Sequence, residues 1–165
     1  MATWGELEGA AGDVEVLAGK VRARFQATGL AIMATLRADG SPRVTGIEPS
    51  FLLGELWLGS MPGARKGADL RRDGRVALHA ATVDKAVADG DAKVAGRAVL
   101  VDDPEVQAAF GAALGEGSDD PHPEPGSYDL FRVDVTELGH LRPEGDHLVI
   151  EWWNPADGYH RIERQ

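Results

Sequence analysis

Short apolar runs separated by tight turns dominate the first third of this chain and constrain its fold more than any other feature. Residues 30–36 form an apolar run, residues 38–41 (Ala-Asp-Gly-Ser) are typical of a turn, and residues 42–48 provide a returning strand. A second tight turn at Gly54-Glu55 divides residues 51–60. Two hairpin signals this close together predict antiparallel β structure.

The rest of the chain continues this pattern and adds short helices. Residues 13–27 carry apolar side chains at helical spacing after Asp13, a suitable N-cap, and this helix is expected to plug or flank a barrel. Asp103 and Pro104 are typical of the start of another helix. A third helix is expected over residues 64–72, ending before Gly74, and further strands over residues 75–83, 93–101, 130–135, 139–142, 148–153 and 159–162.

These elements fit one domain over residues 1–165, which is long enough to bury a core. Residues 115–127 are rich in proline and glycine and predict an irregular loop. Many strands at hairpin spacing with a few short helices indicate a mainly β protein, an antiparallel barrel with α additions.

The charge distribution singles out one turn. The chain has 17 Lys and Arg against 27 Asp and Glu, a net charge of −10, but between Met61 and Arg75 the balance reverses. A phosphate at the start of the expected helix would be stabilised by its backbone N–H groups and by Arg65 and Lys66. The other local cations, Arg71, Arg72 and Arg75, fit a solvated helix face on which they pair with Asp69 and Asp73.

Several function classes lack their residues. The chain has no cysteine, no helical histidine pair of a metal site, no GxSxG nucleophile elbow and no Walker A sequence. Its acidity argues against nucleic-acid binding, and it has neither a signal-peptide pattern nor an apolar run of transmembrane length, so we expect a cytoplasmic protein without membrane partners. An anion site without an acid, base or nucleophile set suggests that a bound phosphorylated cofactor supplies the chemistry.

Four segments carry a resemblance to a known family. In chain order they are ATLRADGSPRVTGI, LWLGS, ARKGADLRRDGRVALHA and AKVAGRAVLVDDPE, all between Gly29 and Arg142. Together they resemble the flavin-binding split β-barrel proteins related to pyridoxamine 5'-phosphate oxidase, including the flavin/deazaflavin oxidoreductases. The resemblance implies a split antiparallel β-barrel and a homodimer whose two cofactor sites lie at the subunit interface.

The resemblance also assigns cofactor-binding positions. Lys66, preceded by Arg65, matches the basic pair that holds the cofactor phosphate. Gly59 and Ser60 match the strand end beside the ribityl chain. The strand whose backbone faces the isoalloxazine ring is matched by Thr45, Gly46 and Ile47.

The chain departs from the true oxidase at two of these positions. Thr45 stands where the oxidase has a phosphate-binding arginine, and Ser50 where it has a lysine. Arg43, two residues before Thr45 and therefore on the same strand face, can supply the missing charge.

The last third of the chain lacks a clear match to the oxidase's substrate-phosphate residues, which argues against oxidation of vitamin B6. Trp152 and Trp153 fit either a wall of the partner's flavin pocket or a core residue beside an interface residue. Arg161 and Arg164 fit surface charges or contacts to an anionic cofactor tail.

The resemblance therefore predicts an oxidoreductase that binds FMN and transfers hydride to or from a small organic substrate. The deazaflavin F420 is the alternative cofactor, and the Ala-, Gly- and Arg-rich composition is compatible with it. Two other hypotheses stay open: a non-catalytic flavin or tetrapyrrole binding protein, and a scaffold protein whose pocket no longer binds a ligand. The sequence assigns no catalytic residue.

Overall fold

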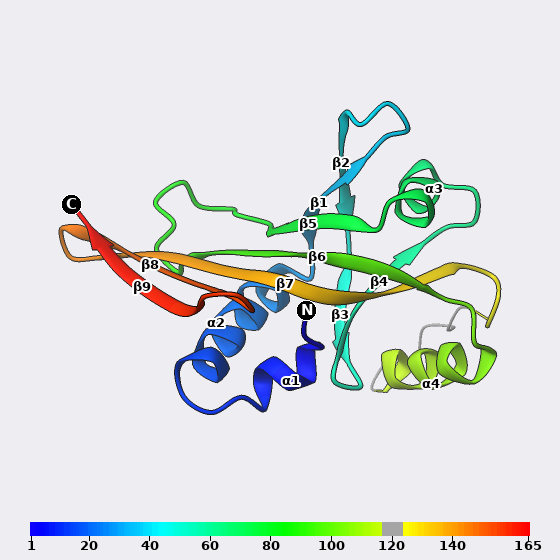
Figure 1. The fold of residues 1–165 in the computed structure, drawn as a ribbon, viewed down its shortest axis with the longest axis horizontal. Helices are drawn as coiled ribbons and strands as arrows, with labels where there is room; N and C mark the ends of the chain where they lie inside the picture. The colour runs from blue at the N-terminus through cyan, green and yellow to red at the C-terminus, as the bar shows by residue number, and fades with distance from the viewer. Residues whose placement is uncertain (117–123) are drawn as a thin grey trace.

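The computed structural model describes residues 1–116 and 124–165, and Figure 1 shows a strongly bent sheet with helices around it. The helices are α1 (Trp4–Glu8), α2 (Asp13–Thr28), α3 (Arg65–Arg72) and α4 (Pro104–Gly115). The strands are β1 (Ala31–Leu36), β2 (Pro42–Ile47), β3 (Pro49–Leu52), β4 (Glu55–Ser60), β5 (Arg75–Ala80), β6 (Asp91–Val101), β7 (Asp129–Glu144), β8 (His147–Asn154) and β9 (Gly158–Arg164).

The sheet is antiparallel and runs in the order β2-β1-β5-β6-β7-β4-β3, with β8 and β9 added beside β7. Its two ends, β2 and β3, follow each other in the chain with only Glu48 between them. The chain thus connects the two edges of the sheet, while the hydrogen-bonded ladder of the described residues does not close. The fold is a split antiparallel barrel with short helices, as the sequence predicts.

The long strands on one side of the barrel correct one expectation. The sequence predicts separate strands over residues 130–135 and 139–142, but β7 is continuous from Asp129 to Glu144. Ala95 pairs with Glu137 and Gly96 pairs with Val135, so Thr136 is an extra residue opposite β6. This β-bulge breaks the alternation of side chains without ending the strand.

The helices at the start of the chain close the core. Leu17, Val21 and Phe25 of α2 are buried against the sheet, and Trp4 of α1 lies 4.5 Å from the ring of Phe51 in an edge arrangement. In the view of Figure 1 both helices lie below the long strands, so α2 flanks the barrel, one of the two placements expected. Burial of these large side chains stabilises the domain.

Helix ends differ in detail from the sequence prediction. The sequence analysis does not predict α1, although Thr3 and Glu6 form the capping box that defines its start. Gly12 rather than Asp13 is the N-cap of α2, and Asp73 rather than Gly74 is the C-cap of α3. The N-cap role of Asp103 in α4 is confirmed, because its carboxylate accepts hydrogen bonds from the backbone N–H groups of Glu105 and Val106.

The turn at Gly40, which has φ 82°, is confirmed. The second turn lies at Leu53 (φ 55°) and Gly54 (φ 72°), one residue earlier than the expected Gly54-Glu55, because Glu55 already belongs to β4. The strand expected over residues 75–83 ends earlier, at Ala80. The predicted loop over residues 115–127 begins with the last residue of α4, and its residues 117–123 lie outside the described part.

A buried polar network ties α2 to the β7–β9 extension. The Glu151 carboxylate of β8 accepts hydrogen bonds from Lys20 Nζ at 2.7 Å and from the Tyr159 hydroxyl at 2.9 Å. Burial raises the pKa of Glu151, but the Lys20 and Tyr159 hydrogen bonds outweigh it and hold the pKa below its usual value. Burial also lowers the pKa of His140, whose Nδ1 lies 3.6 Å from the same carboxylate, and raises the pKa of Tyr159 to about 12.

In residues 1–116 and 124–165 no helix is long and apolar enough to cross a membrane.

Candidate functional site

A buried carboxylate fixes α3 against the sheet. Asp69 of α3 accepts a hydrogen bond from Arg43 Nε at 2.6 Å, from the Thr35 hydroxyl at 3.0 Å, and from Arg72 at 3.2 Å. Burial raises the pKa of Asp69, but these three hydrogen bonds outweigh it and hold the pKa below its usual value. Because Thr35 belongs to β1 and Arg43 to β2, this cluster holds the helix at one place on the first hairpin.

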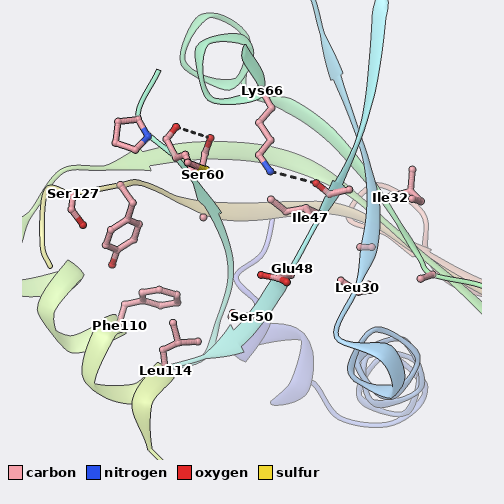
Figure 2. Close-up of a pocket in the computed structure, with 17 residues that line it drawn as sticks. Leu30, Ile32, Ile47, Glu48, Ser50, Ser60, Lys66, Phe110, Leu114 and Ser127 are labelled. Carbon is pink, nitrogen blue, oxygen red and sulfur yellow. Dashed lines mark hydrogen bonds between the residues drawn. The ribbon is translucent and has the colours of Figure 1, made fainter. Parts of the chain in front are cut away.

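A large pocket lies beside the start of α3, where the barrel is split (Figure 2). Its volume is about 800 Å³, within the usual range for small-molecule sites. Most of its wall is apolar. The residues come from the start of β1 (Leu30, Ala31, Ile32), the β2–β3 junction (Gly46, Ile47, Glu48, Ser50), the end of β4 and the turn after it (Gly59, Ser60, Met61, Pro62), Lys66, Ala81, α4 (Phe110, Leu114) and the entry to β7 (Ser127, Tyr128).

One end of the pocket suits an anion. Lys66 lies in the first turn of α3, and its Nζ donates a long hydrogen bond of 3.4 Å to the Gly46 carbonyl. The first turn of α3 packs closely on Ser60, since a Cβ at Gly67 would lie 3.0 Å from the Ser60 hydroxyl. The N–H groups of a helix's first turn have no partner within the helix and attract anions. Figure 2 shows Lys66 and Ser60 on the same side of the pocket, below α3.

The structure brings together five of the eight residues that the sequence selects. Gly46, Ile47, Gly59, Ser60 and Lys66 line this pocket. Their convergence comes from β2, β4 and α3, which are separate in sequence and meet at the split.

The other three selected residues do not line the pocket. Arg65 is exposed next to Lys66, and the hydroxyl of Thr45 is buried with no hydrogen-bond partner among the described residues. Arg43 points to Asp69 instead, and this carboxylate neutralises its charge. A cofactor contact from Arg43 stays a prediction and requires a group that competes with Asp69.

The remaining cations of this region are exposed and paired, as the solvated-face interpretation predicts, but Asp69 is a buried partner and Arg71 pairs elsewhere. Arg72 pairs with Asp69 and Arg75 with Asp73. Arg71 pairs with Asp129 of β7 at 2.5 Å, which links α3 to the long strands.

Sequence reasoning misses the wall that α4 supplies. The sequence places Phe110 and Leu114 only in the apolar stripe of a helix, but both line the pocket, and the Phe110 ring lies 5.4 Å from that of Trp57. Leu114, at the end of this stripe, is 42% exposed. An exposed leucine in an apolar stripe is the one signal that could have indicated a pocket here. Neither Trp152 nor Trp153 lines the pocket of the single chain. Trp152 stacks on His160, and Trp153 packs against the core.

Comparison with known families decides the affiliation. The family model described as pyridoxamine 5'-phosphate oxidase matches residues 17–142, which include β1 to β6 and most of β7. The chain belongs to this family. No curated protein matches it.

Several solved structures have a fold similar to that of this chain. One is PhzG from Burkholderia lata 383 in complex with tetrahydrophenazine-1-carboxylic acid, with a TM-score of 0.66, 12% identity, and coverage of 97% of this chain and 96% of that one. Another is a pyridoxamine 5'-phosphate oxidase-related, FMN binding protein from Nostoc punctiforme PCC 73102, with a TM-score of 0.62, 12% identity, and coverage of 95% and 98%. A heme binding protein from Mycobacterium smegmatis has a TM-score of 0.58 and 20% identity over 82% of this chain and 57% of that one. At these identities the likeness shows the fold alone, and the named ligands differ among the three.

Proposed function

We propose that this member of the pyridoxamine 5'-phosphate oxidase family binds FMN in the pocket at the split and transfers hydride between it and a small organic substrate. The observation that carries the proposal is the position of Lys66. Lys66 belongs to the first turn of α3, and its ammonium group extends to the Gly46 carbonyl in the wall of a mostly apolar pocket. A phosphate ester joined to a flat ring system has this combination of chemical properties.

The anion end has the donors that a phosphate requires. Among the contacts of the described residues, Lys66 makes only the long one to Gly46, and the Ser60 hydroxyl only one of 3.4 Å to the Met61 carbonyl, so both can turn to a ligand. Asp129, whose carboxylate lies beside Gly67 of α3, is neutralised by Arg71. Charge-assisted hydrogen bonds from Lys66 and the helix N–H groups would hold the phosphate.

The apolar part suits the ring. Ile47 approaches from the β2–β3 side, and Phe110 and Leu114 from α4, so that a planar ligand between them is shielded from water (Figure 2). FMN, once bound, supplies the hydride chemistry. The residues of this chain then orient the ring and exclude water, while Lys66 fixes the phosphate and with it the depth of the ring.

We also propose that two copies assemble with the pocket at their interface. Val44, Ala34, Ala77 and Ala95 pair in one row across β2, β1, β5 and β6, without a charged side chain among them. Val44 is 66% exposed, and Ile32, which also lines the pocket, is 47% exposed. An apolar row across four strands that continues into a pocket favours a subunit interface.

The dimer is tested by a charge placed in this row. Val44→Glu is expected to give a monomer in sedimentation velocity and to lose FMN binding with the dimer. Val16→Glu, at an exposed valine of α2 away from the row, is expected to change neither. A wild-type monomer that still binds FMN would overturn the interface assignment.

The cofactor is tested by titrating cofactor-free protein with FMN, F420 and heme in parallel, followed by visible absorbance and fluorescence. We expect saturable FMN binding and, after reduction, electron transfer to a small acceptor faster than to oxygen alone. Selective F420 binding would identify a deazaflavin reductase. Binding without turnover, or selective heme binding, would favour the non-catalytic alternative, to which the fold of the M. smegmatis heme binding protein lends support. The cytoplasmic location remains a prediction from the sequence.

A further inference from the structure

The single residue between β2 and β3 carries a carboxylate on the wall of the pocket. Glu48 is the point where the chain passes from one edge of the sheet to the other, and it lines the pocket next to Ile47. Figure 2 shows Glu48 beside Ile47 and across the pocket from Phe110 and Leu114, and the residue is exposed in the single chain. The barrel split therefore places a negative charge on the exposed wall of the pocket, next to its apolar part.

This charge has no internal partner. Within residues 1–116 and 124–165, Glu48 takes part in no ion pair, and Lys66, the one cation of the pocket wall, approaches the Gly46 carbonyl instead. Asp69, Asp73, Asp129 and Glu151, by contrast, each have a basic partner within 4 Å. Glu48 is thus an acid that the fold leaves available to a ligand.

The charges of the pocket wall then indicate which charge a substrate bound beside the cofactor must carry. Lys66 and Glu48 cancel each other, so the wall contributes no net charge toward a bound phosphate, which carries about −1.5 to −2. A ligand that fills the apolar space removes water from Glu48, and a desolvated carboxylate is costly unless a cation or hydrogen-bond donor meets it.

Resting on the FMN function proposed above, we propose that Glu48 selects substrates with a protonated nitrogen, that is, amines or cationic N-heterocycles on an apolar frame. The ammonium or ring N–H of the substrate meets the Glu48 carboxylate, while its apolar part lies against Phe110 and Leu114. Anionic substrates are disfavoured by Glu48 and by the cofactor phosphate together.

The test uses three probes of one shape: benzylammonium, benzyl alcohol and benzoate. Each is titrated into the FMN-loaded wild-type protein, and binding is followed by the change in the flavin's visible spectrum. We expect benzylammonium to bind at least about tenfold more tightly than benzoate, with benzyl alcohol between them, since one favourable or unfavourable charge contact in a partly buried site is on this scale.

Two variants assign the preference to its residue. Glu48→Gln is expected to bring the benzylammonium and benzoate affinities within about threefold of each other and to tighten FMN binding slightly, since it removes a negative charge near the phosphate. Glu137→Gln removes an exposed carboxylate of β7 outside this pocket and is expected to keep the wild-type preference.

Each other outcome contradicts the proposal in a different way. Wild-type protein that binds FMN but treats the three probes alike, or Glu48→Gln that keeps the preference, overturns the role of Glu48 alone. Loss of FMN binding in Glu48→Gln, with the probe preference unchanged, would make Glu48 a cofactor ligand. Weaker self-association with unchanged preference would make it a subunit contact. Wild-type protein that binds no FMN overturns the proposed function as well.

Discussion

Two buried carboxylates organise opposite parts of this molecule, and their partners differ in kind. Asp69 holds α3 to β1 and β2 through Arg43, Arg72 and Thr35. Glu151 holds α2 to β8 and β9 through Lys20 and Tyr159, with His140 beside it. The Asp69 cluster adjoins the pocket and rests on two arginines, whose charge does not change with pH in the range where proteins fold.

No member of the Glu151 cluster lines the pocket, and the cluster includes His140, whose pKa is lowered by burial. The anion end of the pocket is therefore supported by ion pairs that persist until acid solution, whereas the β7–β9 extension includes a histidine whose charge depends on pH. Substitutions in one cluster at a time can separate the two contributions.

The largest effect is expected at Asp69. Asp69→Asn leaves the mostly buried Arg43 without its counter-charge, and breaking a buried ion pair in this way typically costs about 3 kcal/mol or more. The free energy of unfolding, measured by urea denaturation, should fall by about that amount, and FMN affinity should fall with it because α3 loses its position.

Asp73→Asn is the matched control, one helical turn further along the chain. Arg75 lowers the pKa of Asp73 to about 2, but the pair is exposed, so the urea midpoint and FMN affinity should stay close to wild type. Similar losses in both variants would contradict the special role of the buried carboxylate.

A smaller effect is expected from pH. Burial lowers the pKa of His140 in the folded chain, reinforced by Lys20 and Arg142 nearby and opposed by the attraction of Glu151, so the unfolded chain binds the proton more readily. Stability from this group is therefore present above about pH 6.5 and is lost as pH falls through the lower folded-state pKa. The pKa values of Asp69 and Glu151 are also lowered, so their contributions are lost only in more acid solution.

Urea denaturation of wild type and His140→Asn at about pH 7.5, 6.5 and 5.5 separates the two clusters. The wild type should lose stability toward the most acid of these conditions, and the variant should lose less over the same interval. Equal slopes in the two proteins would show that His140 is not the titrating group.

The smallest effect on stability is expected at Gly67, where a substitution tests the contact between α3 and Ser60. A Cβ there would lie 2.9 Å from the Asp129 carboxylate and 3.0 Å from the Ser60 hydroxyl. Gly67→Ala gains up to about 1 kcal/mol of helix propensity, which offsets part of this crowding, but it should push α3 from Ser60 and weaken FMN binding several-fold.

Gly19→Ala gives the same change in α2, at an exposed position with open space around it. It should raise stability by up to about 1 kcal/mol and leave FMN affinity unchanged. Equal FMN affinity in Gly67→Ala and Gly19→Ala would show that the contact between α3 and Ser60 does not affect cofactor binding.

Local signals made much of the fold predictable. The turns at Gly40 and Gly54 need positive φ, and the Asp103-Pro104 helix start is encoded in adjacent residues, so all three features are found, the second turn one residue earlier than expected. The continuity of β7 was not predictable, because Thr136 is accommodated by a bulge opposite Ala95 and Gly96 of another strand.

The candidate site was predictable only in part for the same reason. Lys66 belongs to a helix that the local sequence already indicates, but the partner of Arg43 lies 26 residues further on, in that helix. The contribution of α4 and the placement of Glu48 on the pocket wall depend on how the split barrel bends, which no local pattern contains.

The central claim is that the start of α3 binds the phosphate of a flavin, and Lys66→Ala beside Arg65→Ala tests it most directly. Only Lys66 of these two neighbouring cations lines the pocket. In fluorescence titrations of cofactor-free protein with FMN at fixed salt, Lys66→Ala should raise the Kd at least about tenfold, the loss of one charge-assisted hydrogen bond, and Arg65→Ala less than about threefold. Equal changes in the two variants, or an unchanged Kd for Lys66→Ala, would contradict the account.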